Sequence, residues 1–178
     1  MGAFDHSLRV RFRTRRRGQS AQATVEMALV LLLLMLLVFG MTEFFHASSA
    51  KQIIQNVSRE GANLASRGTP FRTTLDALVQ SAKPLNIESN GCIILTAVKR
   101  DGSGSLAVSS QQLRGAFPAE SRVGSPGGGS VTLPTNALPL TNQTLYVAEV
   151  FYPIQSMTSV DKLLGQSWTR VLYDVAFF

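Results

Sequence analysis

The residues whose types and spacing carry information are charged ones beside a long apolar run near the N-terminus. Arg15, Arg16 and Arg17 come first, and Glu26 follows at the head of an apolar run. The run from Met27 to Thr42 contains 16 residues and no charge. A carboxylate at the edge of a membrane segment is costly, so it usually has a functional reason to be there. The alternative is that Glu26 only favours the start of a helix through the helix dipole.

Side chains that could perform catalysis or bind metal are few. The two histidines are His6, close to the N-terminus, and His46, just after the apolar run. No Cys/His cluster has metal-ligand spacing, and no Ser or Cys nucleophile has an evident His partner. Cys92 is the single cysteine, which excludes an intramolecular disulfide, and we expect a small buried strand residue there rather than a reactive thiol. The sequence therefore predicts no enzyme, no cofactor, no metal and no small-molecule substrate.

The positive charge is concentrated in the first residues of the chain. Residues 1–21 contain six arginines and one aspartate, a net charge of +5, and the remainder contains 11 basic and 10 acidic residues, a net charge of +1. A nucleic-acid-binding protein needs a basic patch on its folded surface, and this distribution provides none. The arginines instead fit the positive-inside rule. They predict a cytoplasmic N-terminus, with everything after Phe45 outside the cytoplasm.

The length of the apolar run suits one membrane crossing. Its 16 residues cover roughly 24 Å as a helix, which is less than the roughly 30 Å of the hydrocarbon core. Residues 23–25 and Phe44–Phe45 extend it to a full span if Glu26 and Glu43 lie near the interfaces. The alternative is a secretory signal peptide, for which residues 47–50 would be a weak cleavage site.

The helical pattern continues beyond the apolar run. Small and apolar residues recur every three or four positions, and Ser58 is among the polar residues on the other faces. The stripe consists of Ala47, Ala50, Ile54, Val57, Gly61 and Leu64. Arg67–Pro70 provides a stop signal, with Gly68 followed by a proline. We therefore expect a helix over residues 24–67, roughly 66 Å long, whose second half packs against a small domain.

The remaining pattern predicts an α+β domain with an antiparallel sheet packed on the long helix. Residues 71–82 form a short amphipathic helix, and residues 111–143 are loop-like because of their Gly and Pro content. On the last strand, Val171, Tyr173, Val175 and Phe177 share one face, whereas Arg170 and Asp174 lie on the other, which suits a sheet covered on one side. The expected strands are residues 91–99, 144–152 and 167–177, with a turn at 100–104 leading into 106–108 and a short helical turn near 160–164.

These residues carry a resemblance to TadE-like proteins of the Tad (tight adherence, Flp pilus) system. Arg17-Gly18-Gln19-Ser20, followed by Val25–Leu31, resembles the N-terminal pattern of this family, and Glu43-Phe44 matches its second Glu-Phe pair. The segment that contains Arg59-Glu60-Gly61-Ala62 resembles the family's helix extension, so the resemblance covers about residues 15–65. Two departures stand out: Leu32 replaces the family's proline, and three extra residues separate Gly18 from Glu26.

The resemblance implies a type IV pilin-like minor pilin or pseudopilin that a prepilin peptidase cuts on the cytoplasmic side. If Glu26 is the fifth mature residue, the cut falls between Ala21 and Gln22; the alternative cut, between Gly18 and Gln19, makes Glu26 the eighth. An uncleaved anchor is a third option. In the family the carboxylate pairs with the new N-terminal ammonium of a neighbouring subunit. The implied partners are this peptidase, other pilin-like subunits, the pilus assembly platform and membrane lipid, but no nucleic acid.

The predicted organisation is a basic cytoplasmic leader (1–21), a transmembrane helix (22–45) and an extracytoplasmic domain (46–178). The resemblance places it in a bacterial inner membrane, with a role in assembly of a Tad/Flp-type pilus and in surface adherence. The alternative function is a single-pass anchored binding module of the periplasm or cell surface that is not built into a pilus. The N-terminal sequence of the mature protein distinguishes the two functions, because only a pilin-like subunit requires removal of the leader.

Overall fold

The computed structural model describes residues 11–128, 130–155 and 170–178, with side chains from residue 21 onward. The chain divides into two compact units, Met1–Phe44 and Phe45–Phe178, and each is described by itself. Helix α1 (Arg11–Ser66) contributes residues to both units. The helical turn expected near residues 160–164 lies outside the described residues.

The first unit contains the apolar part of α1. The predicted long helix is confirmed, but it begins at Arg11 rather than near residue 24, so the arginine cluster is also helical. Within the described residues, one helix is long and apolar enough to cross a membrane, with a mean hydropathy of 2.5 in its most apolar window and none of that window buried by the rest of the protein. Leu29 and Leu33 remain 64% and 66% exposed, for example. Within the described residues, no other part of the chain covers this apolar surface.

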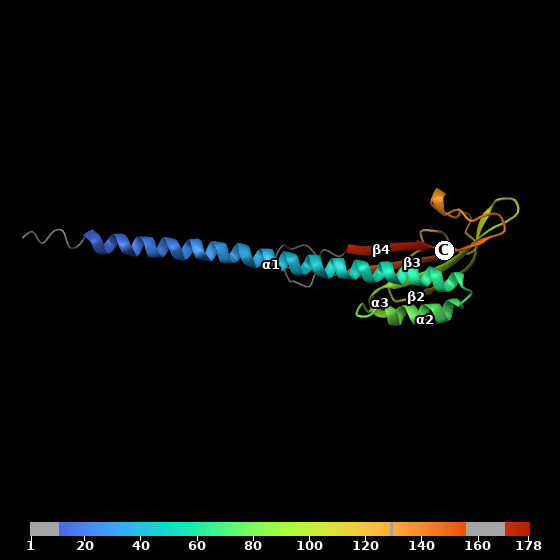
Figure 1. The fold of residues 1–178 in the computed structure, drawn as a ribbon, viewed down its shortest axis with the longest axis horizontal. Helices are drawn as coiled ribbons and strands as arrows, with labels where there is room; N and C mark the ends of the chain where they lie inside the picture. Colours follow the sequence, from blue (N-terminus) through green and yellow to red (C-terminus); the bar gives the residue numbers. More distant parts are fainter. Residues whose placement is uncertain (1–10, 129, 156–169) are drawn as a thin grey trace, which may run out of the picture. The chain divides into compact units, whose positions relative to one another are not determined.

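The second unit is an antiparallel four-stranded sheet with helices on one face (Figure 1), which confirms the predicted α+β class. The strand order is β2-β1-β3-β4, and all neighbours are antiparallel. The strands are β1 (Cys92–Arg100), β2 (Leu106–Arg114), β3 (Thr144–Ile154) and β4 (Arg170–Phe177). The central strand β1 is buried over its first seven residues because both of its faces are covered.

The helical layer consists of the last part of α1 and of α2 (Phe71–Ser81). The predicted small-residue stripe is buried against the sheet: Ala50, Ile54 and Val57 form one core cluster with residues of α2, β1 and β3. Gly61 shows why small residues are needed. A Cβ atom at Gly61 would lie 2.7 Å from Cδ1 of Leu78 and 3.2 Å from Cβ of Ala148, so any larger residue would force Leu78 to move and would loosen the contact of α1 with α2 and β3.

The stop signal after α1 is confirmed. The helix ends at Ser66, and Gly68 has a φ of 84°, a left-handed conformation that favours glycine. The amide of Gly68 donates to the carbonyl of Ala65 at 3.1 Å, and the amide of Thr69 donates to that of Leu64 at 3.3 Å. These bonds satisfy carbonyls that the helix end leaves free, and the turn reverses the chain into α2.

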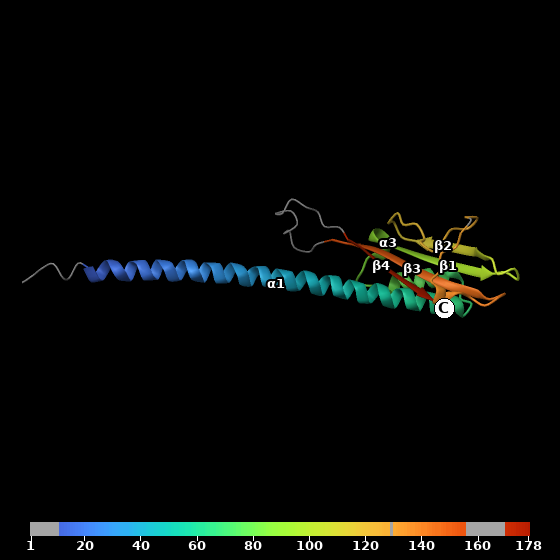
Figure 2. The same ribbon diagram turned by 90° about the horizontal axis from the view of Figure 1, so that it is seen from above.

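The expectation of a sheet covered on one side is wrong. Residues 115–128 and 130–133, which we call the covering segment, lie over the face opposite to the helices. Val123 of this segment is buried with Val98 and Val147, and Phe117 packs against Cys92 and Phe151. Figure 2 shows this segment on the sheet face away from α1. The Gly and Pro content of the segment prevents regular structure but does not prevent it from burying apolar side chains.

Two further details of the sheet differ from expectation. Strand β2 continues to Arg114 instead of ending before residue 111, because Gln111 and Gln112 pair with β1 although their side chains are polar. The predicted alternation along β4 is present, but the face that contains Tyr173 and Val175 does not pack on α1. Leu172 and Ala176 pack with the helical core on the same face as Asp174, whereas Tyr173 and Val175 face the covering segment.

Candidate functional site

The carboxylate at the head of the apolar run is exposed on α1. Glu26 lies on the helical part of the first unit, directly before the apolar run, with an exposed side chain. No hydrogen bond or ion pair within the described part of the chain engages it. The apolar side chains that follow are exposed as well. Glu26 is therefore a charged group on a surface that lipid or another helix must cover.

The residues of the expected cleavage sites are all helical. Ala21 and Gln22 lie on α1 with exposed side chains. Gly18, Gln19 and the cluster of Arg15, Arg16 and Arg17 lie on the same helix, but their side chains are outside the described part. A cut in either position stays a prediction.

The sheet contains a buried carboxylate that was not predicted from the sequence. Glu149 of β3 has no exposed surface, yet it faces the covering segment. Its Oε1 accepts from the backbone amide of Arg122 at 2.9 Å and from the hydroxyl of Tyr173 at 3.1 Å, and its Oε2 accepts from the hydroxyl of Ser121. The guanidinium of Arg122 lies over the Tyr173 ring, 4.0 Å from the centroid. These contacts join the covering segment, β3 and β4 at one point.

Burial in this cluster affects two neighbouring titratable groups. Burial raises the pKa of the Cys92 thiol, and the nearby charge of Glu149 raises it further. Burial also raises the pKa of the Tyr173 hydroxyl, with further contributions from the charge of Glu149 and from the hydrogen bond to it. Both groups are therefore held in their neutral forms, and the expectation of Cys92 as a small buried strand residue is confirmed.

A second polar contact connects the helical layer to β4. Ser58 of α1 has no exposed surface, whereas the sequence pattern predicts it on a polar face of the helix. Its hydroxyl is hydrogen-bonded to Oδ2 of Asp174 on β4. A serine on a helix is usually exposed to water, but here the half-buried carboxylate of Asp174 faces the helix and gives the buried hydroxyl a hydrogen-bond partner.

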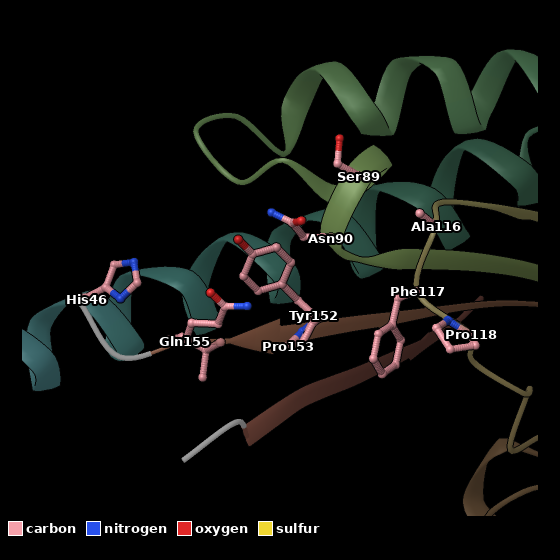
Figure 3. A pocket seen from close by; sticks show the side chains of 10 residues that line it. His46, Ser89, Asn90, Ala116, Phe117, Pro118, Tyr152, Pro153 and Gln155 are labelled. Atoms are coloured by element: carbon pink, nitrogen blue, oxygen red, sulfur yellow. The ribbon is translucent and has the colours of Figure 1, made fainter. Parts of the chain in front are cut away.

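A pocket of about 310 Å³ lies at the end of β3 (Figure 3). Its lining side chains come from α1 (His46), α3 (Asn90), the covering segment (Phe117) and the end of β3 (Tyr152), and from Gln155 just after it. The short helix α3 comprises Ile87–Asn90. His46 and Tyr152 are the titratable side chains among the described lining residues, and Nδ1 of His46 is buried without a hydrogen-bond partner among them.

The structure does not join these groups into a reaction centre. Among the residues that the structure describes, no group of three or more His, Cys, Asp and Glu side chains could hold a metal ion. Glu149 and Asp174 face opposite sides of the sheet, and each already accepts from a hydroxyl. One signal in the sequence could have identified Glu149: an acidic residue in the middle of the otherwise apolar strand Leu145–Tyr152 requires buried partners.

Comparisons with known proteins confirm the resemblance over the N-terminal part of the chain. A search of curated proteins found no match, and a search of solved structures found none either. Residues 21–63 match the model of one protein family, and this segment contains Glu26, the apolar run and the first part of α1 in the second unit. That family is described as TadE-like protein.

Proposed function

We propose that this protein is a minor pilin or pseudopilin that takes part in the assembly of a Tad-type pilus. The observation that carries the proposal is the match of residues 21–63 to the TadE-like family, because it contains both Glu26 and the exposed apolar run. A surface of this kind needs lipid before assembly and neighbouring apolar helices after it. The α+β domain is then displayed outside the cytoplasm, where it contributes to the pilus and to adherence.

The role that we assign to Glu26 is pairing with the N-terminal ammonium of a neighbouring subunit. Both charges would lie among apolar helices, where each is costly without the other. The exposed position of Glu26 supports this role, since the carboxylate is available to another chain. Removal of residues 1–21 by a prepilin peptidase, with a cut between Ala21 and Gln22, would create the ammonium in the corresponding position of each subunit.

Replacement of Glu26 tests the assembly role directly. We expect Glu26→Ala to insert into the membrane and to lose its leader normally, because the basic leader and the apolar run are unchanged. Cross-linking to pilus subunits should fall by at least about tenfold, since one partner of a buried ion pair is lost. Glu26→Asp keeps the charge at a shorter reach and should give an intermediate result. Glu60→Ala is the matched control, because Glu60 is an exposed carboxylate on the same helix. Cross-linking of Glu26→Ala at the level of the control would contradict the role.

Topology and processing are tested independently of Glu26. Protease added to spheroplasts should digest residues 46–178 and spare the leader side, and protection of this domain would contradict the orientation.

N-terminal sequencing of the protein from membranes should begin at Gln22, whereas a start at Gln19 selects the alternative cut. An intact N-terminus would instead support the anchored binding module.

A further inference from the structure

The pocket at the end of β3 contains polar groups that no intramolecular bond uses. The side chains of Asn90, Tyr152 and Gln155 make no hydrogen bond within the described part of the chain, and Nδ1 of His46 is buried without a partner there. Figure 3 shows the Asn90 and Gln155 amides near the Tyr152 ring, with the His46 imidazole beyond them on the side away from Phe117. Buried polar atoms are nearly always paired in folded proteins, so an unpaired one at a pocket indicates a missing partner.

The lining excludes charged ligands. No Lys, Arg, Asp or Glu is among the described residues that line the pocket. Phosphate and carboxylate ligands are held mainly by Arg and Lys, and hard cations are held by carboxylates, so neither class suits this site. Amide, hydroxyl and imidazole groups offer both donors and acceptors, which suits a neutral ligand with several hydroxyl groups.

The pocket also has an apolar side. Phe117, Pro118 and Pro153 line it together with the ring of Tyr152. An apolar wall with a few convergent polar groups is the usual composition of a small-molecule site, and 310 Å³ lies at the lower end of the usual volumes. A sugar ring presents hydroxyl groups around its edge and C–H groups on its face, so it matches both sides of this lining.

The backbone holds the two walls in place. The amide of Phe117 donates to the carbonyl of Gly91 at 3.1 Å, and the amide of Ala116 donates to that of Glu88 at 3.0 Å. A Cβ atom at Gly91 would lie 2.9 Å from the carbonyl oxygen of Phe151, and one at Gly115 would lie 2.2 Å from that of Gly91. Gly91 therefore permits the end of α3 to approach β3 closely, and Gly115 permits the covering segment to approach the junction of α3 and β1. A wall that is ordered before binding lowers the entropic cost of binding.

We infer that this pocket binds one uncharged sugar unit of a glycan. The amides of Asn90 and Gln155 bind ring hydroxyls, the Tyr152 hydroxyl and the His46 imidazole bind further polar groups, and the C–H face of the sugar lies against the apolar wall. The inference does not rest on the proposed role in pilus assembly, since it concerns only residues of the second unit.

The test uses the full chain in micelles of a zwitterionic detergent without a sugar headgroup, because a glycoside detergent would occupy the pocket. The probes are the methyl glycosides of glucose, galactose, mannose and N-acetylglucosamine, each titrated to tens of millimolar, with inorganic phosphate as a separate arm. We expect at least one glycoside to shift the NMR signals of the Asn90 and Gln155 amides in a saturable manner, with a millimolar dissociation constant, and phosphate to shift none.

Variants connect such shifts to the pocket. Asn90→Ala and Gln155→Ala should each weaken binding by at least about fivefold, because each removes a neutral hydrogen-bonding group. Both side chains are exposed, so the fold should persist, and unchanged backbone amide signals of β1 and β3 would verify this. Gln52→Ala is the matched control, since it removes an exposed amide of α1 outside the pocket. The inference is overturned if no glycoside gives saturable shifts, if phosphate alone does, or if Gln52→Ala weakens binding as much as the pocket variants.

Discussion

Removal of the Glu149 carboxylate should destabilise the second unit more than removal of any exposed charge. Glu149 is fully buried, and its two oxygens accept from the Ser121 hydroxyl, the Arg122 amide and the Tyr173 hydroxyl. In Glu149→Ala these three donors lose their acceptor, and a cavity replaces the side chain. The change therefore weakens the covering segment, β3 and β4 together.

The magnitude follows from the exposure of the donors. A hydrogen bond to a charged group contributes about 1.5–3 kcal/mol, so three independent bonds would give an upper limit of several kcal/mol. The three donors differ, however, in their access to water. Arg122 is exposed and Ser121 is only half-buried, so both can bind water once the covering segment moves. We expect a loss of about 3–5 kcal/mol, which is a large part of the stability of a typical domain.

Hydrogen–deuterium exchange of the full chain in micelles measures this loss by segment. In Glu149→Ala, exchange should accelerate by roughly 100-fold to 4,000-fold in the covering segment and along β3 and β4, since each 1.4 kcal/mol corresponds to a factor of ten. Glu149→Gln retains one carbonyl acceptor and should show a smaller effect. Glu120→Ala is the control, because Glu120 is an exposed carboxylate of the same segment and should change stability by less than about 0.5 kcal/mol. Equal exchange in Glu149→Ala and Glu120→Ala would refute the reasoning.

Three further outcomes follow from the structure. Gly61→Val should lower stability by about 1–3 kcal/mol by forcing Leu78 away from α1, and an unchanged thermal midpoint would show that the contact is not tight. Cys92 should react with iodoacetamide at least about 100-fold more slowly in the folded protein than in urea, because it is buried and its pKa is raised; comparable rates would contradict its burial. The pKa of Asp101 should lie below its usual value, because the hydroxyl of Ser103 and then the amide of Ser105 donate to its carboxylate. A folded-state pKa below the unfolded value means that these bonds stabilise the turn above the unfolded pKa and are lost as pH falls through the folded pKa, and an NMR titration that gives an unshifted pKa would contradict this.

The helices of this protein are more predictable from sequence than the covering segment that packs on its sheet. Periodicity identified α1 and α2, and the Gly68 stop is local chemistry that a single chain segment specifies. The covering segment has no period, because it buries single residues such as Val123 from an irregular backbone. Its position depends on Glu149, about 27 residues further along the chain, so no local pattern reveals it.

The same limit applies to the candidate sites. Glu26 was identified from sequence because a long uncharged, apolar run follows it directly, so the contrast is local. The pocket of His46, Asn90 and Tyr152 combines residues from separate segments, and each of them alone reads as an ordinary surface or strand residue. The burial of Ser58 was missed for the same reason, since its partner Asp174 lies 116 positions away in the chain.

Replacement of Glu26 and replacement of Glu149 should therefore have different effects, and the comparison separates a role in assembly from a role in folding. Glu26 is exposed and unpaired within the described residues, whereas Glu149 is buried with three donors. Glu26→Ala should leave exchange protection of residues 115–133 at the wild-type level and reduce cross-linking to pilus subunits. Glu149→Ala should instead lose exchange protection in the covering segment. Its membrane insertion should be unchanged, because the basic leader and the apolar run determine insertion. If Glu26→Ala also lost protection in residues 115–133, its effect on assembly would be a consequence of unfolding, and the pairing role would have no support.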